Sequence, residues 1–313
     1  MPKLGHTELN VAQLCFGGNI FGWTVDEHAS FEVLDAYVAA GGNFIDTADV
    51  YSAWAPGHHG GESETILGEW MHQRNNRNHI IIATKVGMLN NKGQGSDLSR
   101  EHILHAVDAS LHRLRTDYID LYFTHADDPT TPLEETLGTF AELVHTGKVR
   151  AIGASNYTAQ RMTEALRICE AHDYPRFEVQ QPRYNLLNRD NYEGELEKFC
   201  TEQQVSVITY SSLASGFLTG KYRLGAELPT SKRASGVQQR YWNDKNFALL
   251  AHLDTIAQRH NATPSQVALA WLLTRPGVTA PIASATSPEH TRELMGALTL
   301  KLDQDALATL DKG

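Results

Sequence analysis

The stretch FIDTADVY, residues 44–51, begins with an apolar run that ends at an aspartate, Asp46. The apolar run at 80–84 ends in the same way at Lys85, and the run at 118–124 ends at His125. Successive runs end about 40 residues apart, the length of one strand–helix unit. Polar residues at the ends of successive parallel strands meet at one mouth of a barrel, where barrel enzymes carry out their chemistry. We therefore expect Asp46, Lys85 and His125 to share a site with Tyr51, which follows Asp46 in the next loop.

Strand-like and helical stretches alternate along the whole chain. Strands are predicted at about residues 13–18, 43–46, 80–85, 118–124, 149–153, 177–181, 205–210 and 278–282. Helices are predicted at about 27–40, 62–73, 99–114, 132–146, 158–171, 190–203 and 287–296, with an extra one from 264 to about 274. Asp26, Ser99 and Thr263 are expected to cap three of these helices. Because the strands are separated by helices and almost continuously apolar, we expect parallel pairing with both faces covered.

Eight such units can form a closed barrel or an open doubly wound sheet. An open sheet that binds a dinucleotide carries G-x-G-x-x-G after its first strand, and residues 16–22, FGGNIFG, do not match. We therefore predict an α/β fold, a (β/α)8 TIM barrel, as a single domain over residues 1–313. Residues 3–11 are expected to form an N-terminal β-hairpin that closes the bottom of the barrel. Residues 211–242, rich in Gly, Ser, Lys and Arg, are expected to be a long structureless loop with a binding role.

The composition argues against several classes of protein. With 41% hydrophobic and 20% charged residues, 313 residues can bury a large core without disulfides. A formal net charge of −10 argues against a surface that binds nucleic acid. The sequence has no run of about 18 apolar residues, so no membrane span is predicted. Cys15, Cys169 and Cys200 are far apart and suit a reducing cytosol. We expect a cytoplasmic monomer or homo-oligomer without nucleic-acid or membrane partners, and no metal, since His58 and His59 fit a solvated loop.

The residue types at these strand ends suit the reduction of a carbonyl group by hydride. A phenol such as Tyr51 can donate a proton to the developing alkoxide, but its ordinary pKa of about 10 is too high for efficient acid catalysis. An ammonium beside it, that of Lys85, is expected to lower the pKa of Tyr51. Asp46 would balance the charge of Lys85, and His125 would orient the substrate oxygen. Each residue alone suits an ordinary structural role, but their coincidence on successive strand ends favours catalysis.

Several segments resemble the signature segments of the aldo-keto reductases. They are residues 44–51, 61–68 (GESETILG), 82–85 (IATK), 117–125 (DYIDLYFTH), 153–156 (GASN) and 210–216 (YSSLASG). The resemblance extends over about residues 3–300, and residues 217–222 (FLTGKY) are similar to the microbial branch that includes potassium-channel β-subunit-like members. It implies a barrel that binds NADP(H) across its C-terminal mouth. It also implies Tyr51 as the general acid, with Asp46, Lys85 and His125 completing a catalytic tetrad.

The resemblance further implies which residues hold the cofactor. Those around the nicotinamide would be Ser155, Asn156 and Gln181, which bond its carboxamide, and Tyr210, which stacks on its ring. Those around the pyrophosphate would be Ser211, Leu213, Ser215, Gly216 and Lys221. Further contacts would be Gly18, Asn19, Asp46, Ser284, Thr286, His290 and Glu293. Arg233 matches an arginine that reaches the adenosine phosphate.

One part of the cofactor site departs from the family pattern. Ser284, Thr286 and His290 stand where basic residues frequently grip the 2′-phosphate of NADP, and Leu294 stands where an adenine-binding asparagine is common. A neutral site discriminates weakly for a phosphate monoester, whereas Arg233 favours one. NADP(H) is therefore the first expectation, and NAD(H) is the alternative.

The predicted activity is hydride transfer between the cofactor and an aldehyde or ketone, or the corresponding alcohol. Ile20, Phe21, Trp23 and Trp54 are candidates to line the substrate pocket, although they equally suit packing at the barrel rim. One alternative is a regulatory or redox-sensing subunit with little turnover. Two others are a Schiff-base aldolase that uses Lys85 and a metal hydrolase that uses Asp46, His58 or His125. Neither the substrate nor the physiological direction follows from the sequence.

Overall fold

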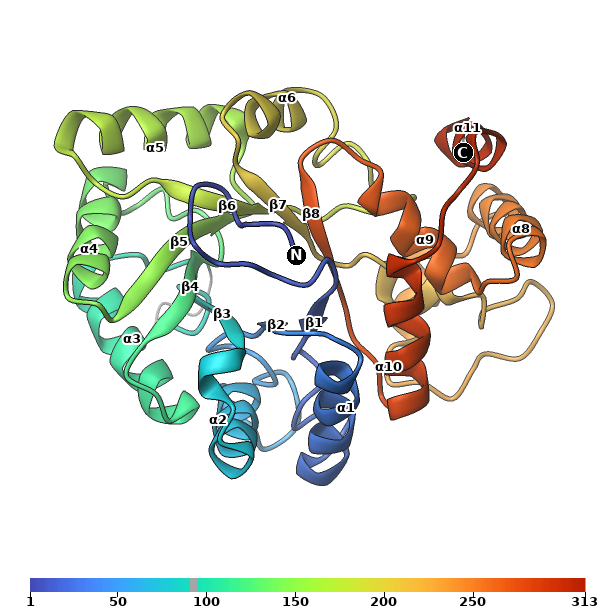
Figure 1. Cartoon of the computed structure of the whole chain (residues 1–313), viewed down its shortest axis with the longest axis horizontal. Coiled ribbons are helices and arrows are strands. Elements are labelled where there is room, and N and C mark those ends of the chain that lie inside the picture. The colour runs from blue at the N-terminus through green and yellow to red at the C-terminus, as the bar shows by residue number, and fades with distance from the viewer. Residues whose placement is uncertain (91–94, 313) are drawn as a thin grey trace.

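Eight parallel strands form a closed barrel in which each strand pairs with its neighbours in chain order and β8 pairs with β1 (Figure 1). The computed structural model describes residues 1–90 and 95–312. The strands are β1 (Cys15–Gly17), β2 (Phe44–Asp46), β3 (Ile81–Val86), β4 (Ile119–Thr124), β5 (Val149–Ser155), β6 (Phe177–Gln181), β7 (Ser206–Thr209) and β8 (Val278–Ala283). The predicted (β/α)8 TIM barrel is confirmed.

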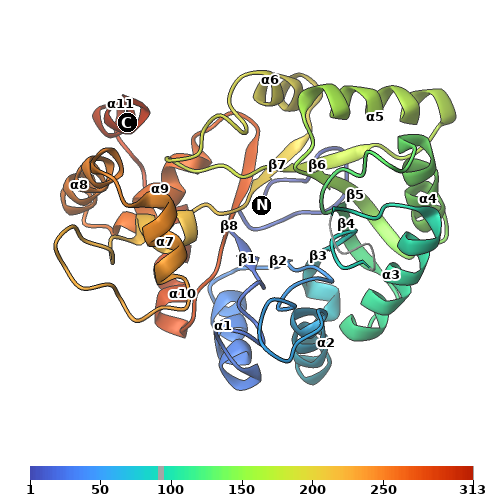
Figure 2. The same cartoon turned by 180° about the vertical axis from the view of Figure 1, so that it is seen from behind.

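Helices cover the outside of the barrel, as the two opposite views show (Figures 1 and 2). Between the strands lie α1 (Glu27–Ala39), α2 (Glu62–Arg74), η1 (Arg77–His79), α3 (Arg100–Leu114), α4 (Leu133–His145), α5 (Ala159–His172) and α6 (Glu195–Glu202). Between β7 and β8 lie η2 (Ala214–Thr219), α7 (Ala234–Tyr241), α8 (Asp244–Arg259) and α9 (Pro264–Leu273). After β8 follow α10 (Pro288–Met295), η3 (Gly296–Leu298) and α11 (Gln304–Lys312).

Two of the three predicted helix caps are present. The carboxylate of Asp26 accepts a hydrogen bond from the Ala29 N–H, and Thr263 forms a capping box with Gln266. Ser99 lies at the predicted position but does not cap α3, because its hydroxyl donates to Asp97 instead. Side chains that bond their own loop in this way compete with the helix for the same groups.

The prediction of a structureless segment over residues 211–242 was wrong. It contains η2 and α7, and α7 buries Ala234, Val237 and Tyr241 against the rest of the protein. α11 was not predicted either. The last turn of α11 is fixed to the rest of the protein by Asp311, which accepts hydrogen bonds from the Trp271 indole at 2.8 Å and from Arg275 at 3.0 Å. Short helices of this kind owe their stability to tertiary contacts rather than to sequence propensity.

The barrel interior is closed from below by the N-terminal segment, as expected. Lys3 and Asn10 form an antiparallel bridge, and Leu4 and Leu9 join the apolar cluster inside the barrel. Figure 1 shows this segment crossing the barrel at its N-terminal end. A larger cluster lies between the strands and the surrounding helices. With its bottom filled by this segment, the barrel has a cavity at the end where the strands finish.

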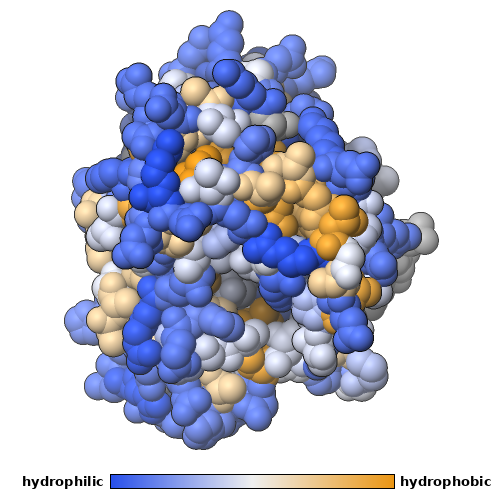
Figure 3. All heavy atoms as spheres, turned by 90° about the vertical axis from the view of Figure 1, so that its right-hand side faces the viewer, coloured by the Kyte–Doolittle hydropathy of each residue, from blue (hydrophilic) through white to orange (hydrophobic). Residues whose placement is uncertain are grey.

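The face formed by the later helices is hydrophilic over most of its area, with separate hydrophobic patches (Figure 3). Across the described residues 1–90 and 95–312, we find no helix with both the length and the apolar character needed to span a bilayer.

Candidate active site

Three of the predicted catalytic residues lie at the C-terminal ends of neighbouring strands. Asp46 is the last residue of β2, Lys85 lies one residue before the end of β3, and His125 directly follows β4. The loop after β2 continues to pair with β3, because the Thr47 N–H donates to the Ala83 carbonyl at 2.8 Å. The chain then turns back toward the barrel axis and places Tyr51 over the mouth.

Lys85, Asp46 and Tyr51 form one hydrogen-bonded group. The Lys85 ammonium lies 2.7 Å from the Asp46 carboxylate, 2.7 Å from the Thr47 carbonyl and 2.9 Å from the Tyr51 hydroxyl. The Tyr51 hydroxyl donates to Asp46 at 3.0 Å, and the Gln181 amide donates to the other Asp46 oxygen at 2.8 Å. Asp46 is 1% exposed and Lys85 is fully buried. All three ammonium donors are engaged, which argues against a Schiff-base nucleophile.

The expected lowering of the Tyr51 pKa was wrong. Burial raises the pKa of the Tyr51 phenol well above its usual value, and the nearby negative charge of Asp46 raises it further. The Asp46 carboxylate, which neutralises Lys85, also accepts a hydrogen bond from the Tyr51 hydroxyl. This hydrogen bond favours the protonated form of the phenol. Tyr51 therefore holds its proton throughout the neutral range in this structure.

His125 lies beside Tyr51, with ring centroids 6.1 Å apart and an interplanar angle of 71°. Burial, and then the positive charge of Lys85, hold the pKa of His125 well below its usual value. A neutral imidazole keeps one N–H donor and one acceptor nitrogen. Its buried Nδ1 has no hydrogen-bond partner among the described residues. The ring is therefore available to bond a ligand without carrying charge.

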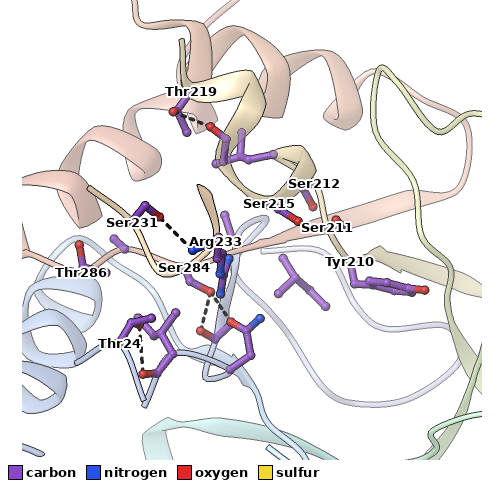
Figure 4. A pocket seen from close by; sticks show the side chains of 18 of the residues that line it. Thr24, Tyr210, Ser211, Ser212, Ser215, Thr219, Ser231, Arg233, Ser284 and Thr286 are labelled. Carbon is purple, nitrogen blue, oxygen red and sulfur yellow. Dashed lines mark hydrogen bonds between the residues drawn. The ribbon is translucent and has the colours of Figure 1, made fainter. Parts of the chain in front are cut away.

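A cavity of about 1060 Å³ at the mouth of the barrel is lined by Asp46 and Tyr51 and by His290 and Glu293 of α10. Figure 4 shows part of its lining. Most of the predicted cofactor and substrate residues line it. They are Asn19, Ile20, Trp23, Trp54, Tyr210, Ser211, Leu213, Ser215, Gly216, Lys221, Arg233, Ser284, Thr286, His290 and Glu293. Ser215 and Gly216 have consecutive positive φ angles of 57° and 94°. Backbone turns of this type form concave anion-binding surfaces.

Four predicted nicotinamide residues form a separate hydrogen-bonded row beside the cavity. Asn156 donates to the Ser155 hydroxyl at 3.0 Å and accepts from the Tyr210 hydroxyl at 2.9 Å. Ser155 in turn donates to the Gln181 carbonyl at 3.0 Å. Because Gln181 also bonds Asp46, the row is continuous with the catalytic group. Tyr210 is the member that lines the cavity itself.

The aromatic candidates for the substrate pocket divide into two groups. Trp54 lies edge-on to Trp23, with centroids 5.6 Å apart, and also meets the Tyr51 ring at 6.0 Å. Trp54 is 50% exposed, so a large part of the indole remains available to a ligand. Phe21 is fully buried and stacks on Phe16, because the turn after β1 folds back on the strand. Its predicted place in the pocket was therefore wrong.

Arg233 and Lys221 are cavity cations that form no ion pair with a carboxylate of residues 1–90 or 95–312. Arg233 points into the middle of the cavity (Figure 4), and one of its terminal nitrogens is buried without a hydrogen-bond partner in the described part of the chain. Burial, followed by the positive charge of Arg233, lowers the pKa of Lys221. Burial likewise lowers the pKa of Arg233. An anion between these side chains would reverse both shifts.

Three further basic residues line the cavity and were not predicted: Arg183, Lys232 and Arg240. Lys232 donates to the Trp23 carbonyl and thereby connects the long loop after β7 to the loop after β1. Arg183 lies two residues beyond the end of β6, so its position in the sequence also indicated a place at the mouth of the barrel. The lining carboxylates are already engaged, Asp46 by Lys85 and Glu293 by the Thr263 hydroxyl. The cavity thus has the character of a site for a polyanion.

No group of three or more His, Cys, Asp or Glu side chains within residues 1–90 and 95–312 is placed to hold a metal ion. The histidine loop instead bonds the start of α2, since the His59 N–H donates to Glu62 at 2.8 Å.

Residues 13–313 match the family model of the aldo/keto reductase family. The chain is 34% identical to Protein tas of Escherichia coli (strain K12), over 99% of this chain and 96% of that one. It is 32% identical to the uncharacterized oxidoreductase YrpG of Bacillus subtilis (strain 168), over 98% and 94% of the two chains. It is 33% identical to a probable voltage-gated potassium channel subunit beta of Arabidopsis thaliana, over 95% and 90%. The chain therefore belongs to the aldo/keto reductase family and is an oxidoreductase, as the sequence predicted.

Proposed function

We propose that this protein transfers hydride between NADP(H) and an aldehyde or ketone, or the corresponding alcohol, with Tyr51 as general acid and base. The observation that carries the proposal is the buried Lys85–Asp46–Tyr51 group at the end of a cation-lined cavity. A proton donor, a charge that stabilises its conjugate base and a polyanion site are thereby placed in one mouth of the barrel.

The bound nicotinamide would supply the hydride to the carbonyl carbon. Tyr51 then gives its proton to the carbonyl oxygen, and its raised pKa ensures that the proton is present at neutral pH. Lys85 donates to the phenol oxygen and stabilises the phenolate that remains. Neutral His125 donates to the substrate oxygen and fixes its position beside Tyr51. Alcohol oxidation uses the same groups in the reverse order.

The residues that would hold the cofactor lie in the cavity and in the hydrogen-bonded row beside it. Ser155, Asn156 and Gln181 would bond the carboxamide, with Tyr210 beneath the ring. The turn at Ser215 and Gly216 and the side chain of Lys221 would hold the pyrophosphate. Arg233 would pair with the 2′-phosphate, while the N-terminus of α10, with Thr286 and His290, faces the same end of the cavity. NADP(H) is favoured over NAD(H) because five basic side chains line the cavity.

We also propose a small carbonyl compound as the partner, in a reducing compartment such as the cytosol. Cys15, Cys169 and Cys200 are all free and buried, which suits such a compartment. The channel-subunit relative keeps open a regulatory role in which turnover is slow. Steady-state rates distinguish the two functions.

Cofactor binding is expected to quench tryptophan fluorescence, because Trp23 and Trp54 line the cavity. Titration with NADPH should give a saturable decrease, and the Trp23→Phe variant should show a smaller one. A screen of aldehydes and ketones that follows NADPH absorbance should then identify turnover. Binding without turnover of any carbonyl would favour the regulatory role, and no response to NADPH or NADH would contradict the proposal.

Replacement of Arg233 by Met should weaken NADPH binding by roughly 10- to 100-fold, the value of one charged hydrogen bond. If Arg233 holds the 2′-phosphate, the Kd for NADH should change little. Arg223→Met is the matched control, because Arg223 lies in the same loop but pairs with Asp254 at 2.6 Å outside the cavity. Equal Kd values for NADPH in the wild type and the Arg233 variant would refute this role.

A further inference from the structure

A second group of ionisable side chains, three of them buried and one partly exposed, lies behind the catalytic residues, on the outer face of the barrel. Its members are Asp49 in the loop after β2, Glu64 on α2, Arg113 on α3 and Tyr122 on β4. Tyr122 faces outward, since its ring stacks on Phe140 of α4. Glu64 is fully buried and Asp49 is 2% exposed. None of these residues takes part in the hydride transfer proposed above.

Glu64 has the partners that a buried carboxylate needs. Its oxygens accept from the Arg113 guanidinium at 2.7 Å and from the Thr84 hydroxyl at 2.5 Å. Arg113 reaches this position because residue 61 is glycine, where a Cβ would lie 2.5 Å from the Arg113 Cδ. The positive charge of Arg113 is therefore already balanced by Glu64.

Asp49 lacks such partners. Both of its carboxyl oxygens are buried, and no side chain among the described residues donates a hydrogen bond to them, although the neighbouring Val50 N–H offsets part of the cost of burying the charge. The charged groups around it are Glu64 from α2, Arg113 from α3 and Lys85 from β3, with the Tyr122 phenol from β4. Burial, and then the charge of Glu64, hold the pKa of Asp49 well above its usual range, and Arg113 and Lys85 offset this only in part. A neutral carboxylic acid is the form that fits this place.

The backbone of Asp49 connects this group to the catalytic residues. The Asp49 N–H donates to the Lys85 carbonyl at 3.3 Å, and the Lys85 ammonium donates to the Thr47 carbonyl at 2.7 Å. Two residues further on, the Tyr51 N–H donates to the Ala48 carbonyl at 3.2 Å. Residues 47–51 are thus one short loop fixed to β3. A negative charge on Asp49 would repel Glu64 and draw water toward this loop, which carries Tyr51.

We propose that Asp49 is a positioning residue that must be protonated to hold Tyr51 in the catalytic group, so that activity is lost as rising pH ionises Asp49. The claim about activity rests on the proposed function, whereas the claim about the proton on Asp49 does not. Two separate readouts are therefore needed.

The first readout is stability against pH for the wild type, Asp49→Asn and the matched control Asp117→Asn, which replaces an exposed aspartate. An aspartate whose pKa is raised by folding keeps its proton in the native state after the unfolded chain has lost it, above a pH of about 4. The folding constant of the wild type should then fall about tenfold per pH unit relative to Asp49→Asn, up to the native pKa of Asp49. Parallel curves for these two proteins would overturn the protonated state.

The second readout is the pH profile of kcat. At the pH where the wild type is active, Asp49→Asn should have a similar kcat. As the pH rises, the kcat of Asp49→Asn should fall at a higher pH than that of the wild type, whereas Asp117→Asn should follow the wild type. An unchanged limb in Asp49→Asn overturns the positioning role. If Asp49→Asn does not fold, infrared spectroscopy of the wild type decides. A protonated carboxyl band should be present where the enzyme is active and should disappear together with activity as the pH rises. Absence of the band at a pH where the enzyme is active overturns the proposal. Lack of turnover in all proteins would refute the proposed function while the stability curves still report on Asp49.

Discussion

Tyr51→Phe is expected to lower kcat by roughly 10²- to 10⁴-fold, the usual contribution of a positioned general acid. The hydroxyl is the group that Lys85 and Asp46 hold at 2.9 and 3.0 Å, and among the described residues no other phenol is hydrogen-bonded to this pair. Phenylalanine keeps the ring and its edge-on contacts with His125 and Trp54. The loss should therefore be one of proton transfer rather than of packing, and it is measured as single-turnover oxidation of NADPH.

Cofactor affinity provides the control for this variant. The Kd for NADPH should stay within about threefold of the wild type, because the hydroxyl that the variant lacks bonds Lys85 and Asp46 and none of the side chains proposed to hold the phosphates. Tyr210→Phe is a useful companion, since it removes a phenol that bonds Asn156 rather than Lys85. If Tyr51→Phe turned over carbonyl substrates at the rate of the wild type, the assignment of the general acid would be wrong.

Lys85→Met is expected to lower the free energy of unfolding by about 3–5 kcal/mol, the cost of leaving one member of a buried ion pair without its partner. Lys85 is fully buried and Asp46 is 1% exposed, so water cannot replace the ammonium in the variant. The loss is a large fraction of the total stability of an ordinary domain. Denaturant unfolding at neutral pH is the measurement, and turnover should also fall because the phenolate loses its donor.

The double variant Asp46→Asn, Lys85→Met tests the electrostatic origin of this effect. Removal of both charges should restore most of the stability lost in Lys85→Met, since no uncompensated buried charge remains. The exposed ion pair of Lys3 and Glu8 provides the comparison. There, replacing the second partner should not restore stability, because removing the first leaves no buried charge. If the double variant were as unstable as the sum of the two single ones, the loss would come from packing and not from charge.

The strand ends were predictable because they depend on local patterns. A buried parallel strand appears as an apolar run, and its C-terminal end lies at the mouth of the barrel whatever the distant packing is. Asp46, Lys85 and His125 follow from this rule, and Tyr51 follows from its distance to Asp46. The long loop after β7 was recognised from its composition, but α7 within it was not, since its helical signal spans only eight residues.

Other features depended on where side chains meet. The sequence predicted that Lys85 would lower the pKa of Tyr51, but the structure places Asp46 against the same hydroxyl and encloses it, so the balance reverses. Phe21 was expected in the pocket and lies in the core instead. The cation-lined cavity also required the fold, because Arg183 follows β6 whereas Lys221 and Arg233 lie in the long loop after β7.

The sequence by itself determined the barrel, its order of strands and the identity of the residues at its mouth, because hydrophobic periodicity and strand–helix spacing are local and repeat along the chain. Only the tertiary structure decided the ionisation of those residues. The pKa of Tyr51, of His125 and of Asp49 depends on burial and on charges brought from other elements, and both act over distances in space that the order of residues does not record.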